Sequence, residues 1–365
     1  MHVISSLSHG GAEKLAIELA SLQKREGLDV SIAYLNSAEW LGNNEEIEKN
    51  FQTLLDNLGI NTYPLDVLPS RSYWLTRTKN FKRSIKRENP HVLHVHLGRG
   101  LMLMLLGRVR IPAVMTIHSI NVGFPKLLFR LFRILHVRYV AVATKIAQLF
   151  QSSVQGEIIV IPNGVDLEKF ENVNLVRNSE KFNFVAIGRV LPPKNYPMLL
   201  DAVEDVLTHT LNRKILWQLK IAGDGPLLNE MKELVTAKGL GEVVEFIGGC
   251  DNIPAFLAQA DAFVMSSDYE GMPMAMLEAM SAKLPVVCTN FLGVDDVVES
   301  EVSALISPVG DATALAKNMI RVIESNTLRD SLVSNGSKNL ERFSIKVTHQ
   351  EYLKIYDLAL SDGLN

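Results

Sequence analysis

Two carboxylates, Glu270 and Glu278, lie in a segment that leads from an apolar strand into a helix. Residues 262–265 form the predicted strand, Glu270 ends the polar loop behind it, and Glu278 falls near the second helical turn. Gly271 and Pro273 precede this helix, and proline suits a first helical turn. Free N–H groups at a helix N-terminus attract negative charge, so phosphate chemistry beside the two acids is expected. Taken singly, either glutamate could instead be a helix cap or a surface residue.

Two cations follow an earlier predicted strand. Arg189 and Lys194 lie in a turn with a glycine and two prolines, between the strand at residues 182–187 and a helix start. Arginine binds pairs of oxygen atoms and lysine acts as a point charge, so the two together suit a diphosphate. Basic residues on a solvated turn are the alternative, and the spacing with glycine and proline favours the phosphate interpretation.

Glycines mark two further strand–turn–helix corners. Gly10 and Gly11 follow the first predicted strand, and Gly223 and Asp224 follow the strand predicted over residues 216–222. Glycine lets a backbone approach a ligand closely, and a helix N-terminus favours phosphate. The G-x-G-x-x-G pattern is absent at the first corner, so a dinucleotide site is not indicated. Both corners could also be ordinary tight turns.

Histidines end two neighbouring predicted strands. His118 closes the strand at residues 113–118, where it could position a hydroxyl group or share a proton near neutral pH. It could equally cap its own turn with Ser119. His94 and His96 end the preceding strand, but a zinc site there lacks the usual spacing and an obvious carboxylate. We therefore expect no metal.

The elements that must position these residues form two blocks of alternating strands and helices. At 365 residues the chain exceeds the size that one core usually serves. The blocks meet at Ile161-Pro162-Asn163-Gly164, and strands alternating with helices predict parallel sheets. We predict an α/β fold with two Rossmann-like, doubly wound domains, residues 1–162 and 163–343, facing each other across a cleft. Turns at the carboxyl ends of the strands would line that cleft.

Composition restricts the location and the partners of the protein. Two cysteines indicate a reducing compartment, and we find no signal peptide and no apolar run long enough to span a membrane. Residues 1–160 contain 19 Lys/Arg and 12 Asp/Glu, whereas residues 161–365 contain 18 and 28. Residues 70–150 hold 15 of the cations and one acid, Glu88. Such a block predicts an anionic partner.

One part of this basic block has an amphipathic pattern. At α-helical spacing, Phe124, Leu127, Leu128, Leu131 and Leu135 form one stripe, flanked by Lys126, Arg130 and Arg133. This is the pattern of an interfacial helix, and a helix that packs on a Rossmann sheet has nearly the same pattern.

In this order, the motifs together resemble the retaining glycosyltransferases of the GT-B fold, specifically family 4 (glycosyl transferases group 1), which transfer sugars from nucleotide diphosphates. The E-x7-E pattern from Glu270 to Glu278 is the most specific motif of the resemblance. The other matching motifs are Gly10-Gly11-Ala12-Glu13, Thr116-Ile117-His118, Ile161-Pro162-Asn163-Gly164-Val165-Asp166, Gly188-Arg189…Lys194 and Gly223-Asp224-Gly225-Pro226. They span nearly the whole chain.

The resemblance implies a role for each candidate residue. Arg189 and Lys194 would hold the donor diphosphate and stabilise it as a leaving group, without a metal or another cofactor. Glu270 would contact the donor sugar, Glu278 the ribose, and His118 would lie near the reacting centre. The remaining expected donor contacts are Gly11, Gly223, Asp224, Gly271, Met272, Pro273 and Met274. The C-terminal helix at residues 344–360, which carries Tyr352 and Tyr356, would pack back on the N-terminal domain.

The expected enzyme is therefore a retaining, metal-independent hexosyltransferase that uses a UDP- or GDP-sugar. Its acceptor would be a glycan or a lipid-linked glycan, as in the synthesis of bacterial lipopolysaccharide or capsule. We expect it in the cytoplasm, either free or peripherally on the inner face of the cell membrane, where the N-terminal domain would meet anionic lipid.

A nucleotide-sugar epimerase on the same fold is the alternative. A nucleic-acid-binding protein is a further one, but few aromatic residues accompany the cations, so no nucleic acid is expected.

Overall fold

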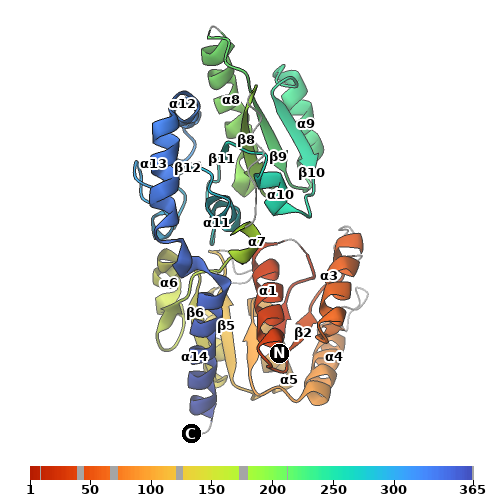
Figure 1. Cartoon of the computed structure of the whole chain (residues 1–365). Helices are drawn as coiled ribbons and strands as arrows, with labels where there is room; N and C mark the ends of the chain where they lie inside the picture. Colours follow the sequence, from red (N-terminus) through yellow and green to blue (C-terminus); the bar gives the residue numbers. More distant parts are fainter. Residues whose placement is uncertain are drawn as a thin grey trace. The chain divides into compact units, whose positions relative to one another are not determined.

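The computed structural model describes residues 1–8, 10–38, 45–65, 73–120, 126–171, 180–211 and 213–363. The chain divides into two compact units. Unit 1 comprises Met1–Gly164 and Ile345–Asn365, and unit 2 comprises Val165–Ser344. In Figure 1 the C-terminal helix, drawn in blue, returns to the red and yellow elements of unit 1. The sequence had indicated a division after residues 162 and 343, whereas the structure divides after Gly164 and Ser344.

Unit 1 is built on a parallel sheet with the strand order β3-β2-β1-β4-β5-β6-β7. Its strands are β1 (His2–Ile4), β2 (Ser31–Tyr34), β3 (Asn61–Pro64), β4 (Leu93–Val95), β5 (Ala113–Ile117), β6 (Val137–Ala141) and β7 (Ile158–Val160). Its helices are α1 (Gly11–Arg25), α3 (Glu45–Asn57), α4 (Tyr73–Glu88), α5 (Gly98–Gly107), α6 (Thr144–Phe150) and α14 (Ile345–Gly363), with the 3-10 helices η1 (Lys126–Ile134) and η2 (Gln151–Ser153).

Unit 2 is built on a second parallel sheet, with the strand order β10-β9-β8-β11-β12-β13. Its strands are β8 (Phe182–Ile187), β9 (Trp217–Ala222), β10 (Val244–Gly248), β11 (Ala262–Met265), β12 (Val286–Thr289) and β13 (Leu305–Ser307). Its α-helices are α7 (Glu168–Glu171), α8 (Tyr196–Leu211), α9 (Leu228–Ala237), α10 (Ile253–Leu257), α11 (Met274–Ser281), α12 (Ala312–Glu324) and α13 (Asn326–Ser337). The 3-10 helices are η3 (Pro192–Lys194), η4 (Val294–Asp296) and η5 (Leu340–Phe343).

Both sheets are doubly wound, as predicted. The strand order reverses between β1 and β4 in unit 1 and between β8 and β11 in unit 2. The β8–β11 pair is parallel, with Phe184 opposite Ala262 and Val185 opposite Phe263. Ligands of such sheets bind beyond the carboxyl ends of the strands at the reversal point. In unit 2 this point is the start of the Arg189–Lys194 turn and of the Glu270 loop.

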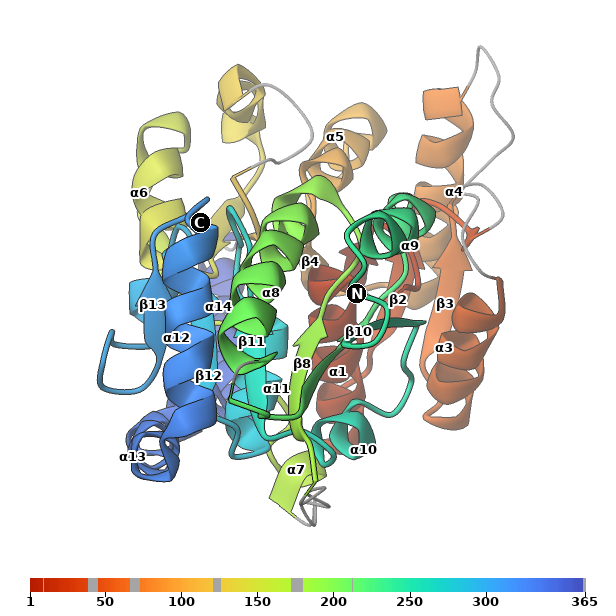
Figure 2. The ribbon, with the colours of Figure 1, turned by 90° about the horizontal axis from the view of Figure 1, so that it is seen from above.

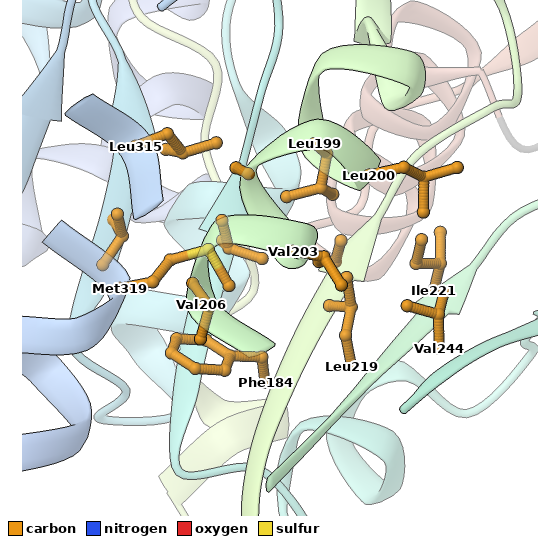
Figure 3. Packing of buried hydrophobic residues seen from close by; sticks show 14 of the residues in the cluster. Phe184, Leu199, Leu200, Val203, Val206, Leu219, Ile221, Val244, Leu315 and Met319 are labelled. Atoms are coloured by element: carbon orange, nitrogen blue, oxygen red, sulfur yellow. The ribbon is translucent and has the colours of Figure 1, made fainter. Parts of the chain in front are cut away.

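Much of the core of unit 2 lies between its sheet and the helices α8 and α12. Figure 2 shows α8 and α12 side by side, and the two helices contact each other. Figure 3 shows Val203 of α8 and Met319 of α12 facing Phe184 and Leu219 of the sheet, and all four are fully buried. Burial of one such side chain contributes about 1.5–3 kcal/mol. A core of this size gives the turns at the sheet edge a rigid support.

In unit 1, α14 packs on α1 and on β5. Leu15 and Leu19 of α1, Val114 of β5, and Tyr352 and Ile355 of α14 belong to one buried apolar cluster. The C-terminal part of α14 is also joined to β6, since Arg138 donates two hydrogen bonds to the Asp362 carboxylate, at 2.5 and 2.8 Å. This helix therefore covers the same face of the sheet as α1.

The prediction of an α-helical apolar stripe around residue 131 is wrong. Residues 126–134 form the 3-10 helix η1, in which side chains three positions apart align. The pair that faces the core is therefore Phe129 and Phe132, both buried, with ring centroids 6.1 Å apart. Leu131, which the sequence placed in the apolar stripe, is 50% exposed and therefore does not pack on the sheet. Phe124 and the side chains of Leu127 and Leu128 lie outside the described residues. Within the described part of the chain, no helix is both long and apolar enough to span a bilayer.

Candidate active site

Lys194 and Glu270 meet at the edge of the sheet in unit 2, beyond β8 and β11. The Lys194 Nζ donates a hydrogen bond of 2.6 Å to Glu270 Oε1. The two side chains are 20% and 14% exposed, so the pair is largely shielded from solvent. Ser267 Oγ donates a second hydrogen bond, of 2.7 Å, to the same carboxylate oxygen. The carboxylate is thus fixed from two sides, while the site keeps some access to solvent.

The loops that carry this pair are also joined by other hydrogen bonds. The backbone N–H of Asp268 donates to the Pro193 carbonyl at 2.9 Å, and Asn195 Nδ2 donates to Asp268 Oδ1 at 2.7 Å. Ser266 Oγ donates to the Lys194 carbonyl at 2.7 Å. These bonds hold the two loops together independently of the ion pair. Removal of the Lys194 charge should therefore leave the position of the loops unchanged.

Three glycines allow the two turns after β8 and β9 to approach each other closely. A methyl group on Gly223, whose φ is +154°, would meet the Gly188 carbonyl oxygen at 2.0 Å. One on Gly225 would meet the Val190 carbonyl oxygen at 2.4 Å, and one on Gly188 would meet the Lys194 stem at 2.7 Å. The turns after β8 and β9 are therefore in backbone contact. Their glycines are required by this packing as well as by any ligand.

Arg189 and Asp224 lie on the same pair of turns, and both are exposed. The Val190 N–H donates to the Asp224 carbonyl at 2.9 Å, which fixes the two turns next to each other. Within the described residues, Arg189 forms no salt bridge with a carboxylate. An exposed cation at the carboxyl end of β8 is available to an anionic ligand.

The helix α11 follows Glu270 directly and is deeply buried. Pro273 is its N-cap, and residues 274–280 are all buried. Met272 and Met274 are buried at its start, and Gly271 is partly exposed. Glu278 is only 5% exposed, so the interpretation as a surface residue is wrong. Carboxylates are seldom buried to this extent unless they are paired.

In unit 1, His118 ends a chain of buried histidine rings. Its Nε2 lies 3.0 Å from His96 Nδ1, and His96 Nε2 lies 3.0 Å from His2 Nδ1. At its other end, this row of hydrogen-bonded rings reaches α1, where His2 Nε2 lies 2.8 Å from Gln23 Oε1. The His118 side chain is partly exposed, but its Nδ1 atom is buried and has no hydrogen-bond partner within the described residues.

A second branch leaves Gln23 through its amide nitrogen. Gln23 Nε2 donates to the Tyr356 hydroxyl at 3.1 Å, and that hydroxyl lies 2.7 Å from His94 Nδ1. His94 Nε2 lies 2.8 Å from Thr116 Oγ1, which lies 2.8 Å from the Tyr352 hydroxyl. Both tyrosines belong to α14, so the helix that covers the sheet also completes its buried polar network.

Burial keeps these histidine rings neutral. Desolvation, together with the nearby N-terminal amine, lowers the pKa of His2 to about 3. It lowers the pKa of His94 and of His96 well below 6.5, and that of His118 to about 4. A charged imidazole is disfavoured where water cannot solvate it. At neutral pH each ring therefore carries one N–H donor and one acceptor nitrogen.

His2 and Gln23 were missed by the sequence reasoning. His2, His94 and His96 place one ring nitrogen each within 4.8 Å of one another, which is close enough for a shared metal ion. The usable signal was the alternation of polar residues along apolar strands, at positions 94 and 96 and at 116 and 118. No local signal marks Gln23, which reaches the network only because α1 packs on the sheet.

The glycine pair starts α1. Gly10 is its N-cap and Gly11 its first residue, and Gly11 is exposed. Ser5 donates a hydrogen bond to the Glu13 carboxylate, which folds back over Gly10, where a methyl group would collide with it. The glycine at position 10 is thus explained by this contact within the turn.

The structure brings together part of the predicted set. Lys194 and Glu270 are in contact, and Arg189, Gly223 and Asp224 lie on the adjoining turns of unit 2. Gly271–Met274 and Glu278 belong to the segment that follows. Gly11 and His118 belong to unit 1.

Comparison with known proteins identifies the class. Residues 9–169 match the family model described as Glycosyltransferase Family 4, and residues 168–339 match the model described as Glycosyl transferases group 1. The two matches together cover almost all of the chain. The chain belongs to this family of glycosyltransferases.

Individual relatives agree with this assignment. The chain is 32% identical over 195 residues to the UDP-Gal:alpha-D-GlcNAc-diphosphoundecaprenol alpha-1,3-galactosyltransferase of Escherichia coli. This match covers 50% of this chain and 49% of that one. It is 28% identical over 187 residues, 51% of each chain, to a GalNAc-alpha-(1->4)-GalNAc-alpha-(1->3)-diNAcBac-PP-undecaprenol alpha-1,4-N-acetyl-D-galactosaminyltransferase of Campylobacter jejuni. The matched part thus spans about half the length of these two relatives.

A solved structure supports the fold. Anabaena Alr3699/HepE, in complex with UDP and glucose, superposes with a TM-score of 0.77 at 19% identity, over 98% of both chains. The GT-B fold, which the sequence motifs had indicated, is thereby confirmed.

Proposed function

We propose that the protein transfers a glycosyl residue from a nucleoside diphosphate sugar to a glycan or lipid-linked acceptor, with retention of anomeric configuration. The observation that carries this proposal is the 2.6 Å contact between Lys194 and Glu270 at the β8–β11 reversal point. In a sugar nucleotide, one oxygen atom joins the terminal phosphate to the anomeric carbon. A cation for the phosphate and a carboxylate for the sugar hydroxyls must therefore lie side by side, as this pair does.

Each residue of the site has a role in this reaction. Arg189 and Lys194 bind the diphosphate and stabilise the charge that develops when the bond from C1 to the phosphate oxygen breaks. Glu270 accepts hydrogen bonds from the donor sugar, and Glu278 accepts them from the ribose. The acceptor oxygen forms its bond to C1 on the face that the leaving group occupied. Its proton passes to the departing diphosphate. The two cations supply positive charge without a metal ion.

The named relatives favour a lipid-linked acceptor. Both curated relatives described above carry diphosphate-linked undecaprenol in their names. A bacterial surface polysaccharide is then the expected product, with UDP or GDP as the released nucleotide. An epimerase remains the alternative, and it would change the sugar without forming an acceptor glycoside.

Helix α4 supports contact of unit 1 with an anionic membrane. Trp74 and Leu75, in its first turn, are 37% and 75% exposed. Its other exposed residues include five cations, namely Lys79, Lys82, Arg83, Lys86 and Arg87. Apolar and cationic groups on one helix suit a lipid interface, and each cation near an anionic leaflet contributes about 1 kcal/mol.

Thermal shift with candidate nucleotides tests the donor site. A bound ligand raises the melting temperature by mass action, so a sugar nucleotide at about 100 times its Kd should stabilise unit 2 by about 2.7 kcal/mol. We expect UDP or GDP, and one of their sugars, to give a saturable shift that Lys194→Met reduces. If no nucleotide shifts the transition and no nucleoside diphosphate is released with any acceptor, the proposed function is wrong.

Vesicle sedimentation tests the membrane contact. The protein should sediment with phosphatidylglycerol vesicles and stay in solution with phosphatidylcholine vesicles, and salt should weaken the binding because it screens exposed charges. The double variant Lys82→Glu, Arg83→Glu should lose binding, whereas Lys232→Glu, on an exposed position of α9 in unit 2, should retain it. Equal sedimentation of both variants would contradict a specific role of α4.

A further inference from the structure

The histidine chain of unit 1 has a defined direction. Gln23 Oε1 can only accept a hydrogen bond, so His2 Nε2 must donate to it. A neutral imidazole has one N–H group, and His2 Nδ1 is therefore an acceptor for His96 Nε2. By the same argument, His96 Nδ1 accepts from His118 Nε2. The proton of His118 must then be on Nε2.

We propose that Gln23, through His2 and His96, holds His118 in the tautomer whose Nδ1 is an unprotonated hydrogen-bond acceptor for a substrate hydroxyl. Gln23, His2 and His96 are positioning residues in this scheme. The assignment of the tautomer stands on the hydrogen-bond chain alone. The substrate hydroxyl rests on the proposed function, which puts His118 near the reacting centre.

The free nitrogen of His118 points to a missing donor. Its Nδ1 is buried and has no hydrogen-bond partner within the described residues, and a buried acceptor without a donor costs free energy. Such unsatisfied groups call for a water molecule, a ligand or a catalytic role as their explanation. A hydroxyl group of a bound sugar would satisfy this acceptor.

In the structure, the Gln23 amide directs its nitrogen to the second branch. Its Nε2 donates to the Tyr356 hydroxyl, which can pass its own proton to His94 Nδ1. His94 then donates from Nε2 to Thr116 Oγ1. If the amide were reversed, every donor in both branches would reverse. His118 would then hold a buried N–H without an acceptor. Packing of α14 on α1 places the Tyr356 hydroxyl beside the Gln23 amide nitrogen.

A metal ion shared by His2, His94 and His96 is the competing explanation. Each of their six ring nitrogens already lies within 3.0 Å of another protein atom that can share a hydrogen bond. His94 and His96 are stacked, with centroids 4.1 Å apart and an angle of 27° between their planes. Metal ligands instead direct free lone pairs at one point. The hydrogen-bonded chain accounts for all of these contacts.

Nitrogen NMR of the full chain labelled with ¹⁵N-histidine tests the proposal, because protonated and unprotonated ring nitrogens have different shifts. His118, assigned by its loss in His118→Gln, should be protonated at Nε2 and unprotonated at Nδ1. Gln23→Leu removes the acceptor of His2, and the fraction of His118 protonated at Nδ1 should rise. Gln23→Glu is the matched control, because its carboxylate still accepts from His2. Its His118 tautomer should match that of the unaltered chain.

Each outcome decides a separate point. Protonation of Nδ1 in the unaltered chain overturns the proposal, and this measurement needs no variant to fold. An unchanged tautomer in a folded Gln23→Leu protein overturns the role of Gln23. If the His2, His94 and His96 nitrogens shift on addition of one equivalent of Zn²⁺, these residues form a metal site and the proposed hydrogen-bond chain is wrong. We also expect Gln23→Leu, but not Gln23→Glu, to lower kcat/KM for transfer about tenfold. If the tautomer results hold and only this loss of activity is absent, the placement of His118 near the reacting centre in the proposed function is wrong.

Discussion

Lys194→Met is expected to lower kcat for sugar transfer by about 10²–10³, the usual effect of removing one group that stabilises developing negative charge. Methionine keeps most of the aliphatic stem that packs on Gly188 and removes only the ammonium group. The loops should stay in place, because the Asp268–Pro193 and Ser266–Lys194 hydrogen bonds do not use the charge. The measurement is the rate of nucleoside diphosphate release at saturating donor and acceptor.

The control for this variant is Lys232→Met. Lys232 also belongs to unit 2, where it is exposed on α9, and its replacement should leave kcat unchanged. Glu270→Gln gives an independent comparison, because the amide can still donate and accept hydrogen bonds but lacks the charge. If Lys194→Met folds with a normal melting curve and retains full kcat, Lys194 does not stabilise the leaving group.

Most of the fold could be predicted because its strands are short apolar runs between turn residues. Strands β8 and β11 have the predicted bounds, 182–187 and 262–265. The segment around η1 could not, because leucine and phenylalanine alternate there with arginine at spacings that fit two periods. Packing of Phe129 and Phe132 against the core selects the 3-10 geometry, and this packing depends on β6 and on Phe150.

Only part of the candidate site could be predicted from the sequence, for a related reason. Lys194 and Glu270 could be selected singly, since each follows a predicted strand and polar residues at strand ends are usual site residues. Their contact depends on β8 and β11 being neighbours, which the order of the strands along the chain does not state. Gln23 shows the limit more clearly. It looks like any polar residue of an amphipathic helix, and only the docking of α1 and α14 gives it two buried partners.

Acidification is expected to destabilise unit 1 between pH 6.5 and about pH 3. The pKa of His2, His94 and His96 lies below 6.5 in the folded chain, because burial disfavours their charged forms. In that range the unfolded chain binds more protons than the folded chain. Stability therefore rises with pH, is fully present above pH 6.5, and is lost as the pH falls. From pH 7 to pH 5, each buried histidine should cost about 2 kcal/mol of unfolding free energy.

Hydrogen exchange of the β4 amides at pH 7 and pH 5, corrected for the intrinsic exchange rates, measures this change in unit 1 itself. Exchange from a core strand reports the free energy of global unfolding, and it separates unit 1 from unit 2 in a chain that need not unfold in one step. His96→Gln removes one of the titrating rings and should reduce the loss by about 2 kcal/mol, in proportion to the number of rings. His91→Gln, at an exposed position just before β4, should leave the loss unchanged. Equal protection at the two pH values would mean that the folded chain can accommodate protons on these rings, through solvent entry or a bound anion. The one-way hydrogen-bond chain to His118 would then not persist in solution.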